Sequence, residues 1–209
     1  IRRQRQMCIR DRDMVSAYPV LSRQVHRDDV RLCTAADAGK GLIRDRDYDA
    51  DALITAEKGL PLVVFSADCG ILLLHDPDAG CVGAVHAGWR GCAAGIVEKT
   101  VREMVRLLGA RPERILAAVG PCIGKCCFET DGDVPEAMRA SALEPYLERR
   151  GPKYHVDLAG LNRQWLLHAG VAPEHIDICG LCTACRPDLF WSHRKMGEAR
   201  GAQVAVICL

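Results

Sequence analysis

The sequence predicts one α/β domain with a mixed or antiparallel sheet. Three short apolar segments, residues 61–67, 71–74 and 81–85, follow one another with tight turns between them, a pattern that does not fit simple βαβ repeats. An amphipathic helix comes next and ends at Gly109, a residue suited to a helix C-cap. Its apolar residues keep the i, i+4, i+7, i+8, i+11 spacing of one buried face: Val97, Val101, Met104, Val105 and Leu108. No internal repeat or linker divides the 209 residues, which suffice for one sizeable core.

The other elements follow from the same signals along the chain. Residues 36–51 are rich in Asp, Gly and Arg and predict a loop. Helices are expected over about 134–147, where Pro135 suits the first turn, and over 158–168, which Gly170 ends. Further strands are expected where short apolar runs lie between turn residues: 19–32, 51–55, 115–119, 176–179 and 204–209.

Bulk composition is that of a globular protein and argues against several function classes. The apolar share is 49% and the charged share 26%, close to the average for such proteins. A formal net charge of +1 argues against electrostatic binding of nucleic acid. No apolar run approaches the ~20 residues that span a bilayer, and no secretory signal pattern occurs. We therefore expect a cytoplasmic protein without membrane contact, as a monomer or a small homo-oligomer.

The first residues differ in character from the rest of the chain. Residues 1–13 carry five arginines and almost no apolar pattern. We interpret them as non-native sequence or as a disordered basic arm. The single folded domain is expected over residues 19–209.

Twelve cysteines are many for a chain of this length. Without an export signal, reduced thiols are the expectation, some of them binding metal. Cys179, Cys182 and Cys185 lie three residues apart and, with Cys126 and Cys127, could form a structural zinc or iron–sulfur site. Cysteine is also a small buried hydrophobe, which is the expected role of four others: Cys33, Cys81, Cys92 and Cys208.

The stretch His86–Gly91 (HAGWRG) is the most suggestive for chemistry, because an apolar strand leads into it and a helix leaves it. Cys69 also follows an apolar strand, and His26 lies at the end of a third strand candidate. If these strand ends are neighbours, two imidazoles and one thiol meet. Three such ligands suit Zn²⁺ with one open position, as in catalytic rather than structural sites.

Other residues are candidates for binding anions or bases. Gly120–Gly124 (GPCIG) follows a strand and can either present backbone N–H groups or form a simple tight turn. Phe190, Trp191 and Arg194 combine stacking rings with a fixed cation. In an extended chain the side chain of Asp68 points away from that of Cys69.

Six short motifs together resemble one family. They are, in chain order, Gln24–His26 (QVH), Ala67–Cys69 (ADC), HAGWRG, GPCIG, Cys182–Thr183 and Phe190–Arg194 (FWSHR). This set resembles the YfiH/LACC1 family of zinc-dependent purine nucleoside phosphorylases, formerly described as multicopper polyphenol oxidases or laccase-domain proteins. The resemblance covers residues 19–209 and implies a three-layer α/β/α sandwich with mixed sheets, the CNF1/YfiH-like fold.

The resemblance also implies an activity and a site. It implies an enzyme that converts adenosine, inosine, guanosine or methylthioadenosine and phosphate into free base and ribose 1-phosphate, and that also deaminates adenosine. The family's zinc ligands match His26, Cys69 and His86. We expect Arg90 and Arg194 to hold anionic oxygens, and Phe190 or Trp191 to stack on the purine. Nothing before Pro19 matches the segment with which family members begin, so the domain is expected to be N-terminally truncated.

Other functions remain open at this point. Cys69 could act as the nucleophile of an amidase with His86 as its base. The many cysteines could also belong to a non-catalytic metal-binding or redox protein. Copper-dependent phenol oxidation fits poorly, because multicopper oxidases need many more histidines than the seven present.

Overall fold

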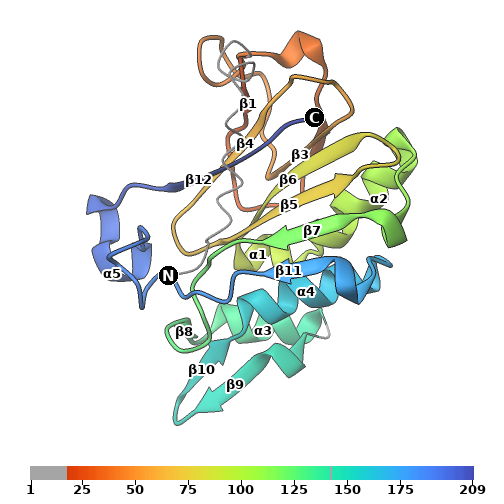
Figure 1. Ribbon diagram of the computed structural model, residues 1–209. Helices are drawn as coiled ribbons and strands as arrows, with labels where there is room; N and C mark the ends of the chain where they lie inside the picture. The colour runs from red at the N-terminus through yellow and green to blue at the C-terminus, as the bar shows by residue number, and fades with distance from the viewer. Residues whose placement is uncertain (1–17, 142) are drawn as a thin grey trace.

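The computed structural model describes residues 18–141 and 143–209, and it confirms an α/β fold with mixed sheets. The central sheet contains, in spatial order, β11 (Ile176–Ile178), β7 (Leu116–Val119), β5 (Gly70–Asp76), β6 (Cys81–Ala87), β3 (Ala52–Thr55) and β2 (Val30–Leu32) (Figure 1). The four middle strands pair antiparallel, whereas β2 with β3 and β7 with β11 are parallel. The tight succession of β4 (Leu62–Ser66), β5 and β6 along the chain is the one that the sequence predicted.

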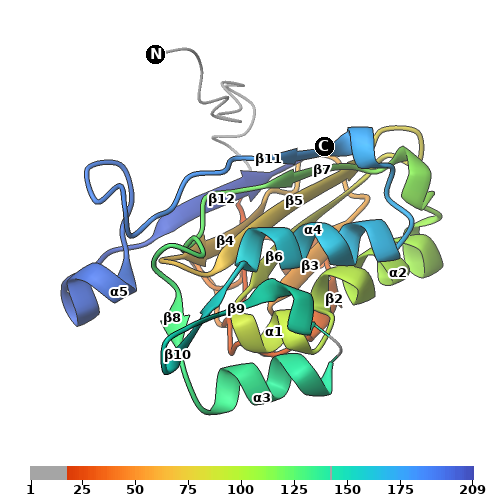
Figure 2. The ribbon, with the colours of Figure 1, turned by 90° about the horizontal axis from the view of Figure 1, so that it is seen from below.

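Helices and a second sheet cover opposite faces of this central sheet. The helices α1 (Trp89–Ala93), α2 (Ile96–Leu108), α3 (Asp133–Ala140) and α4 (Leu158–His168) lie together on one side (Figure 2). On the other side lies a mixed sheet of β1 (Val20–Leu21), β4 (Leu62–Ser66) and β12 (Gln203–Ile207). There are thus three layers, and in the described residues the layer opposite the helices consists of strands.

Burial on both faces explains the continuous apolar runs of the central strands. Successive side chains of a strand point to opposite faces. In β5, Leu72 and Leu74 join the core beneath the helices, while Ile71 and Leu73 pack into the core against the second sheet. A strand buried on both faces needs apolar residues at nearly every position, which is why no polar alternation is visible in the sequence here.

The predicted helix 97–108 is present as α2, with one correction. Gly109 caps it in the left-handed region (φ 70°) as expected, and Gly95 (φ 75°) separates it from the short helix α1. Met104 is fully buried, but Val105 is 39% exposed, so Val105 was wrongly placed on the buried face. Consecutive helical residues lie about 100° apart around the axis, and this step carries Val105 past the edge of the apolar stripe.

Three other expectations need correction or addition. The strand expected over 19–32 is two strands, β1 and β2, separated by a loop that carries His26. The helix expected over 134–147 ends at Ala140, and Leu147 begins β9 (Leu147–Arg150). With β10 (Lys153–Val156) and β8 (Glu129–Thr130), this strand forms a small antiparallel sheet. The sequence did not predict this small sheet, because three consecutive charged residues in β9, Glu148, Arg149 and Arg150, leave no alternation of apolar and polar residues there.

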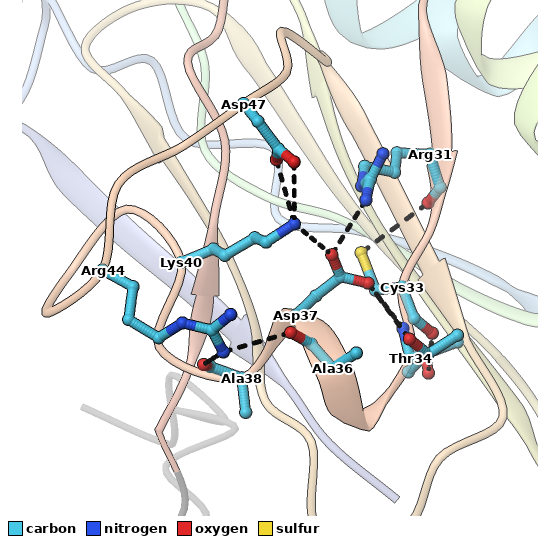
Figure 3. Close-up of polar contacts among 10 residues, drawn as sticks. Arg31, Cys33, Thr34, Ala36, Asp37, Ala38, Lys40, Arg44 and Asp47 are labelled. Atoms are coloured by element: carbon cyan, nitrogen blue, oxygen red, sulfur yellow. Dashed lines mark hydrogen bonds and ion pairs between the residues drawn. The ribbon is translucent and has the colours of Figure 1, made fainter.

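The polar stretch 36–51 forms a loop as predicted, and a buried carboxylate orders it (Figure 3). Asp37 accepts hydrogen bonds from the backbone N–H of Thr34 and from Arg31 Nη2, at 2.9 and 2.8 Å, and Lys40 Nζ lies 3.1 Å away. Burial would raise the pKa of Asp37, but these donors lower it below its usual value. The loop is therefore fixed in place by ion pairs and hydrogen bonds.

Two remaining expectations concern the ends and the surroundings of the domain. The interpretation of residues 1–13 lies outside the described residues. Among the described residues, no helix has both the length and the apolar character required to cross a bilayer.

Neighbouring residues on α2 provide a matched test of this packing. We expect Met104→Ala to lower the free energy of unfolding by about 2–5 kcal/mol, because it leaves a cavity in the core. Val105→Ala, one position further on the same helix, should change it by no more than ~0.5 kcal/mol. Urea denaturation of both variants measures the difference, and equal losses would contradict the assignment of the buried face.

Candidate active site

The structure brings together the three residues proposed as metal ligands. His26 lies in the loop between β1 and β2, Cys69 in the turn between β4 and β5, and His86 in β6. Their potential ligand atoms all lie within 4.8 Å of one another. The two imidazole rings meet edge to face, with centroids 4.9 Å apart and planes at 86°. One thiol and two imidazoles thus converge on one point, as a metal ion would require.

Asp51 holds two of these residues in place. Its buried carboxylate accepts hydrogen bonds from the backbone N–H groups of Val25, His26 and Arg27, each at 3.0 Å. It also lies 2.7 Å from Nδ1 of His86. With Nδ1 engaged, Nε2 of His86 is the nitrogen left to act as a ligand. Sequence reasoning missed Asp51, although an acidic residue directly before an apolar strand is the signal that could have found it.

Two backbone features make room for this convergence. His26 adopts a positive φ of 60°, a conformation that histidine enters more readily than most residues. Gly88 lies against all three side chains. A Cβ there would lie 3.0 Å from Cδ2 of His26, 3.1 Å from Sγ of Cys69 and 3.7 Å from Cε1 of His86. The first glycine of HAGWRG is therefore required for close approach.

The neighbouring groups change the protonation of Cys69 and His86. Burial alone would raise the pKa of the Cys69 thiol, but hydrogen bonds with His26 and His86 outweigh it and lower the pKa to about 6. Burial alone would lower the pKa of His86, but its hydrogen bonds with Asp51 and Cys69 raise it to about 9. Cys69 is thus prepared as a thiolate, the form in which cysteine binds metals.

A second buried carboxylate supports the turn that carries Cys69. Asp68 has a positive φ of 87°, and it accepts hydrogen bonds from Thr183 Oγ1 (2.6 Å), Ser192 Oγ (3.1 Å) and the backbone N–H of Arg194 (2.7 Å). Both of its carboxylate oxygens thus accept hydrogen bonds from the C-terminal motifs. Asp68 therefore joins distant parts of the sequence, a role that spacing along the chain does not reveal.

The candidate substrate residues have other contacts. Arg90 is exposed on α1, with its guanidinium 4.2 Å from the ring centroid of Trp89 and 3.6 Å from Asp133. The guanidinium of Arg194 instead donates to the backbone carbonyls of Cys127 and Glu129, at 3.0 and 2.9 Å. Hydrogen bonds tie the backbone of Trp191 to the side chain of Gln203.

The two rings at this end differ in exposure. Trp191 is 46% exposed and Phe190 is half-buried. An exposed indole retains a free face on which a planar ligand could stack.

Comparison with known proteins identifies the family of this chain. The family model described as multi-copper polyphenol oxidoreductase laccase matches residues 1–209. The chain belongs to this family. The resemblance that the six motifs indicated is therefore confirmed, and the motif residues lie at the candidate site or in the segments that support it.

Two named proteins are similar to this chain in sequence. A protein of Deinococcus radiodurans named purine nucleoside phosphorylase is 44% identical over 162 residues, which make up 78% of this chain and 62% of that protein. A protein of an unknown prokaryotic organism named adenosine deaminase RL5 is 36% identical over 190 residues, 87% of this chain and 71% of that protein. The chain thus spans somewhat less than two thirds of the Deinococcus relative.

A solved structure confirms the fold. The crystal structure of the hypothetical protein YfiH of Bacillus licheniformis superposes with a TM-score of 0.87 at 32% sequence identity. The match covers 91% of this chain and 74% of that one. The strands and turns that position the candidate ligands are thus part of an arrangement shared with a solved family member.

The position of Asp51 leads to a testable prediction. Asp51→Asn removes the negative charge that orients His86, so we expect metal affinity to fall roughly 10–100-fold, as for other outer carboxylate partners of histidine ligands. Asp49→Asn is the matched control, because Asp49 lies two residues away and pairs with Arg23 at the surface. Titration with Zn²⁺ against a competing chelator measures both variants, and equal affinities would rule out this role.

Proposed function

We propose that this chain acts on purine nucleosides at a zinc ion held by His26, Cys69 and His86. The reaction is phosphorolysis of adenosine, inosine, guanosine or methylthioadenosine to free base and ribose 1-phosphate, with deamination of adenosine as a second activity. The convergence of two imidazoles and one thiol within 4.8 Å carries this proposal. The names of the two relatives support the choice of substrate.

The donor set supports zinc as the metal. Imidazole and thiolate are ligands typical of zinc, and three protein ligands leave one position open. Among the described residues, this is the one metal-binding group that contains histidine, so it does not supply the several copper centres of multicopper chemistry. When bound, zinc would lower the pKa of a water molecule towards ~7 and act as a Lewis acid. The reduced thiols that the site needs fit the cytoplasm, where we propose that the protein works.

The chain's own residues would orient the reactants. Asp51 fixes the ring of His86, and Gly88 leaves space beside the ligands. Arg90 is the better candidate for holding phosphate, since its guanidinium is exposed, lies over the ring of Trp89 and pairs with Asp133 at the long distance of 3.6 Å. Arg194 already donates to two backbone carbonyls. Trp191 and Phe190 are proposed as stacking partners for the purine.

The amidase hypothesis depends on the same thiol and is not favoured. It would need Cys69 as a free nucleophile with one base, whereas two imidazoles lie against this sulfur. A non-catalytic metal-binding role is not favoured either, because the two relatives cited above bear the names of enzymes.

A product assay tests the proposed function. The zinc-loaded protein is incubated with adenosine and phosphate, and adenine, inosine and hypoxanthine are separated by chromatography. We expect phosphate-dependent release of adenine together with some inosine. The same assay is run on a version that carries the N-terminal family segment before Pro19. Absence of all three products from both zinc-loaded proteins would overturn the proposal.

The metal ligands give a second prediction for this function. His86→Ala and Cys69→Ala each remove a ligand, so we expect zinc binding and turnover to fall by more than the roughly 100-fold that loss of an outer partner can cause. Cys208→Ala, which changes a cysteine outside the triplet, should leave both zinc binding and turnover unchanged. A wild-type number of zinc ions together with full turnover in His86→Ala or Cys69→Ala would show that the ligands are assigned wrongly.

The two arginines are expected to behave differently. Arg90→Ala should raise KM for phosphate roughly tenfold or more, because a hydrogen bond to a charged group contributes about 1.5–3 kcal/mol. Arg194→Ala should instead lower the melting temperature, since it leaves two backbone carbonyls without their donor. Steady-state kinetics and thermal unfolding separate the two effects, and an unchanged KM in Arg90→Ala would remove Arg90 from the phosphate site.

A further inference from the structure

Four cysteines converge at a second place, away from the triplet in sequence. The sulfur atoms of Cys126, Cys127, Cys182 and Cys185 all lie within 4.8 Å of one another. Sγ of Cys185 is 3.5 Å from that of Cys126 and 3.4 Å from that of Cys127. Cys179 completes the C-x-x-C-x-x-C spacing in the sequence but does not belong to this group. The group thus contains two cysteines from each of two segments that are distant in the sequence.

The parallel pairing of β7 and β11 brings these segments together. Both strands end at the same edge of the central sheet, so the loops that follow them leave side by side (Figure 1). The contact continues beyond the strands as a bridge between Cys122 and Cys182. The backbone N–H of Thr183 also donates to the carbonyl of Cys122 at 3.1 Å. The two cysteine pairs therefore lie on turns whose relative position is set by the sheet.

The backbone around the cluster is shaped to receive the sulfur atoms. The N–H of Gly124 donates to Sγ of Cys182 at 3.2 Å, and such donors stabilise the thiolate form. A Cβ at Gly124 would lie 3.1 Å from Cβ of Cys182 and 3.3 Å from Sγ of Cys126, so only glycine fits without displacement. Gly124 has the same relation to this cluster as Gly88 has to the triplet.

The spacing of the sulfur atoms matches one ion rather than a disulfide or a larger cluster. Zinc–sulfur bonds of about 2.3 Å in a tetrahedron place the sulfurs roughly 3.8 Å apart. A disulfide needs about 2.05 Å, well below the 3.4 and 3.5 Å found here. An iron–sulfur cluster holds several metal and sulfide ions between its cysteines and so requires a wider separation.

We propose that Cys126, Cys127, Cys182 and Cys185 form a tetrahedral thiolate site for one zinc ion, separate from the triplet. Four protein ligands leave no open position, so the role is structural. The ion would join the loop after β7 to the segment that begins at Cys182. That segment supplies Thr183, Ser192 and Arg194, the three donors to Asp68 beside Cys69. This inference does not depend on the nucleoside activity.

Metal stoichiometry tests the proposal directly. Protein purified under reducing conditions is saturated with Zn²⁺, desalted and analysed by native mass spectrometry. We expect two zinc ions per chain in the wild type and one in Cys182→Ser/Cys185→Ser. Cys179→Ser is the matched control, an exposed cysteine on the same segment, and should retain two. Equal numbers of zinc ions in the wild type and in the double variant would overturn the proposal.

A measurement on the wild type keeps the test valid if the double variant fails to fold. Cys126, Cys185 and Cys179 are all exposed, so iodoacetamide can reach all three thiols when no metal is bound. With zinc bound, we expect alkylation of Cys126 and Cys185 to slow at least tenfold relative to Cys179, because coordinated sulfur is a poorer nucleophile. Peptide mass mapping measures the extent of alkylation at each cysteine. Equal rates at all three cysteines in the zinc-saturated protein would contradict the site.

Discussion

The buried carboxylate of Asp51 is the constraint on which the candidate site depends. It accepts three consecutive backbone N–H groups and contacts His86 Nδ1, and its backbone carbonyl accepts the N–H of His86 at 2.7 Å. Hydrogen bonds to a charged group contribute about 1.5–3 kcal/mol each. Without these donors, the buried charge of Asp51 would destabilise the fold. The loop of His26 and strand β6 are therefore held as one unit.

Asp68 plays the corresponding part on the side of Cys69. Its three donors all come from the last 27 residues of the chain, so the C-terminal motifs reach the site through this carboxylate. Two ligands of the proposed four-cysteine zinc site, Cys182 and Cys185, lie on the same segment, next to Thr183. The family motifs thus include residues that support the ligands as well as the ligands themselves.

The cysteines show how environment separates residues of one type. Burial raises the pKa of Cys33 to about 12 and that of Cys81 to about 11, so these thiols stay neutral and act as small core residues. Burial also acts to raise the pKa of the half-buried Cys69, yet its two imidazole neighbours lower this pKa to about 6. Charge and hydrogen bonding therefore decide which cysteine can bind a metal.

The sequence by itself determined the elements with a strong local pattern and the family. The stripe of α2, the apolar central strands and the six motifs are local features, and they predicted the helix, the sheet and the proposed triplet of His26, Cys69 and His86. Only the tertiary structure decided which distant groups meet. Asp51 meets the loop of His26, Asp68 meets Thr183, and Cys126 meets Cys185, because strand pairing and order in the sheets, which local spacing does not encode, place these segments side by side.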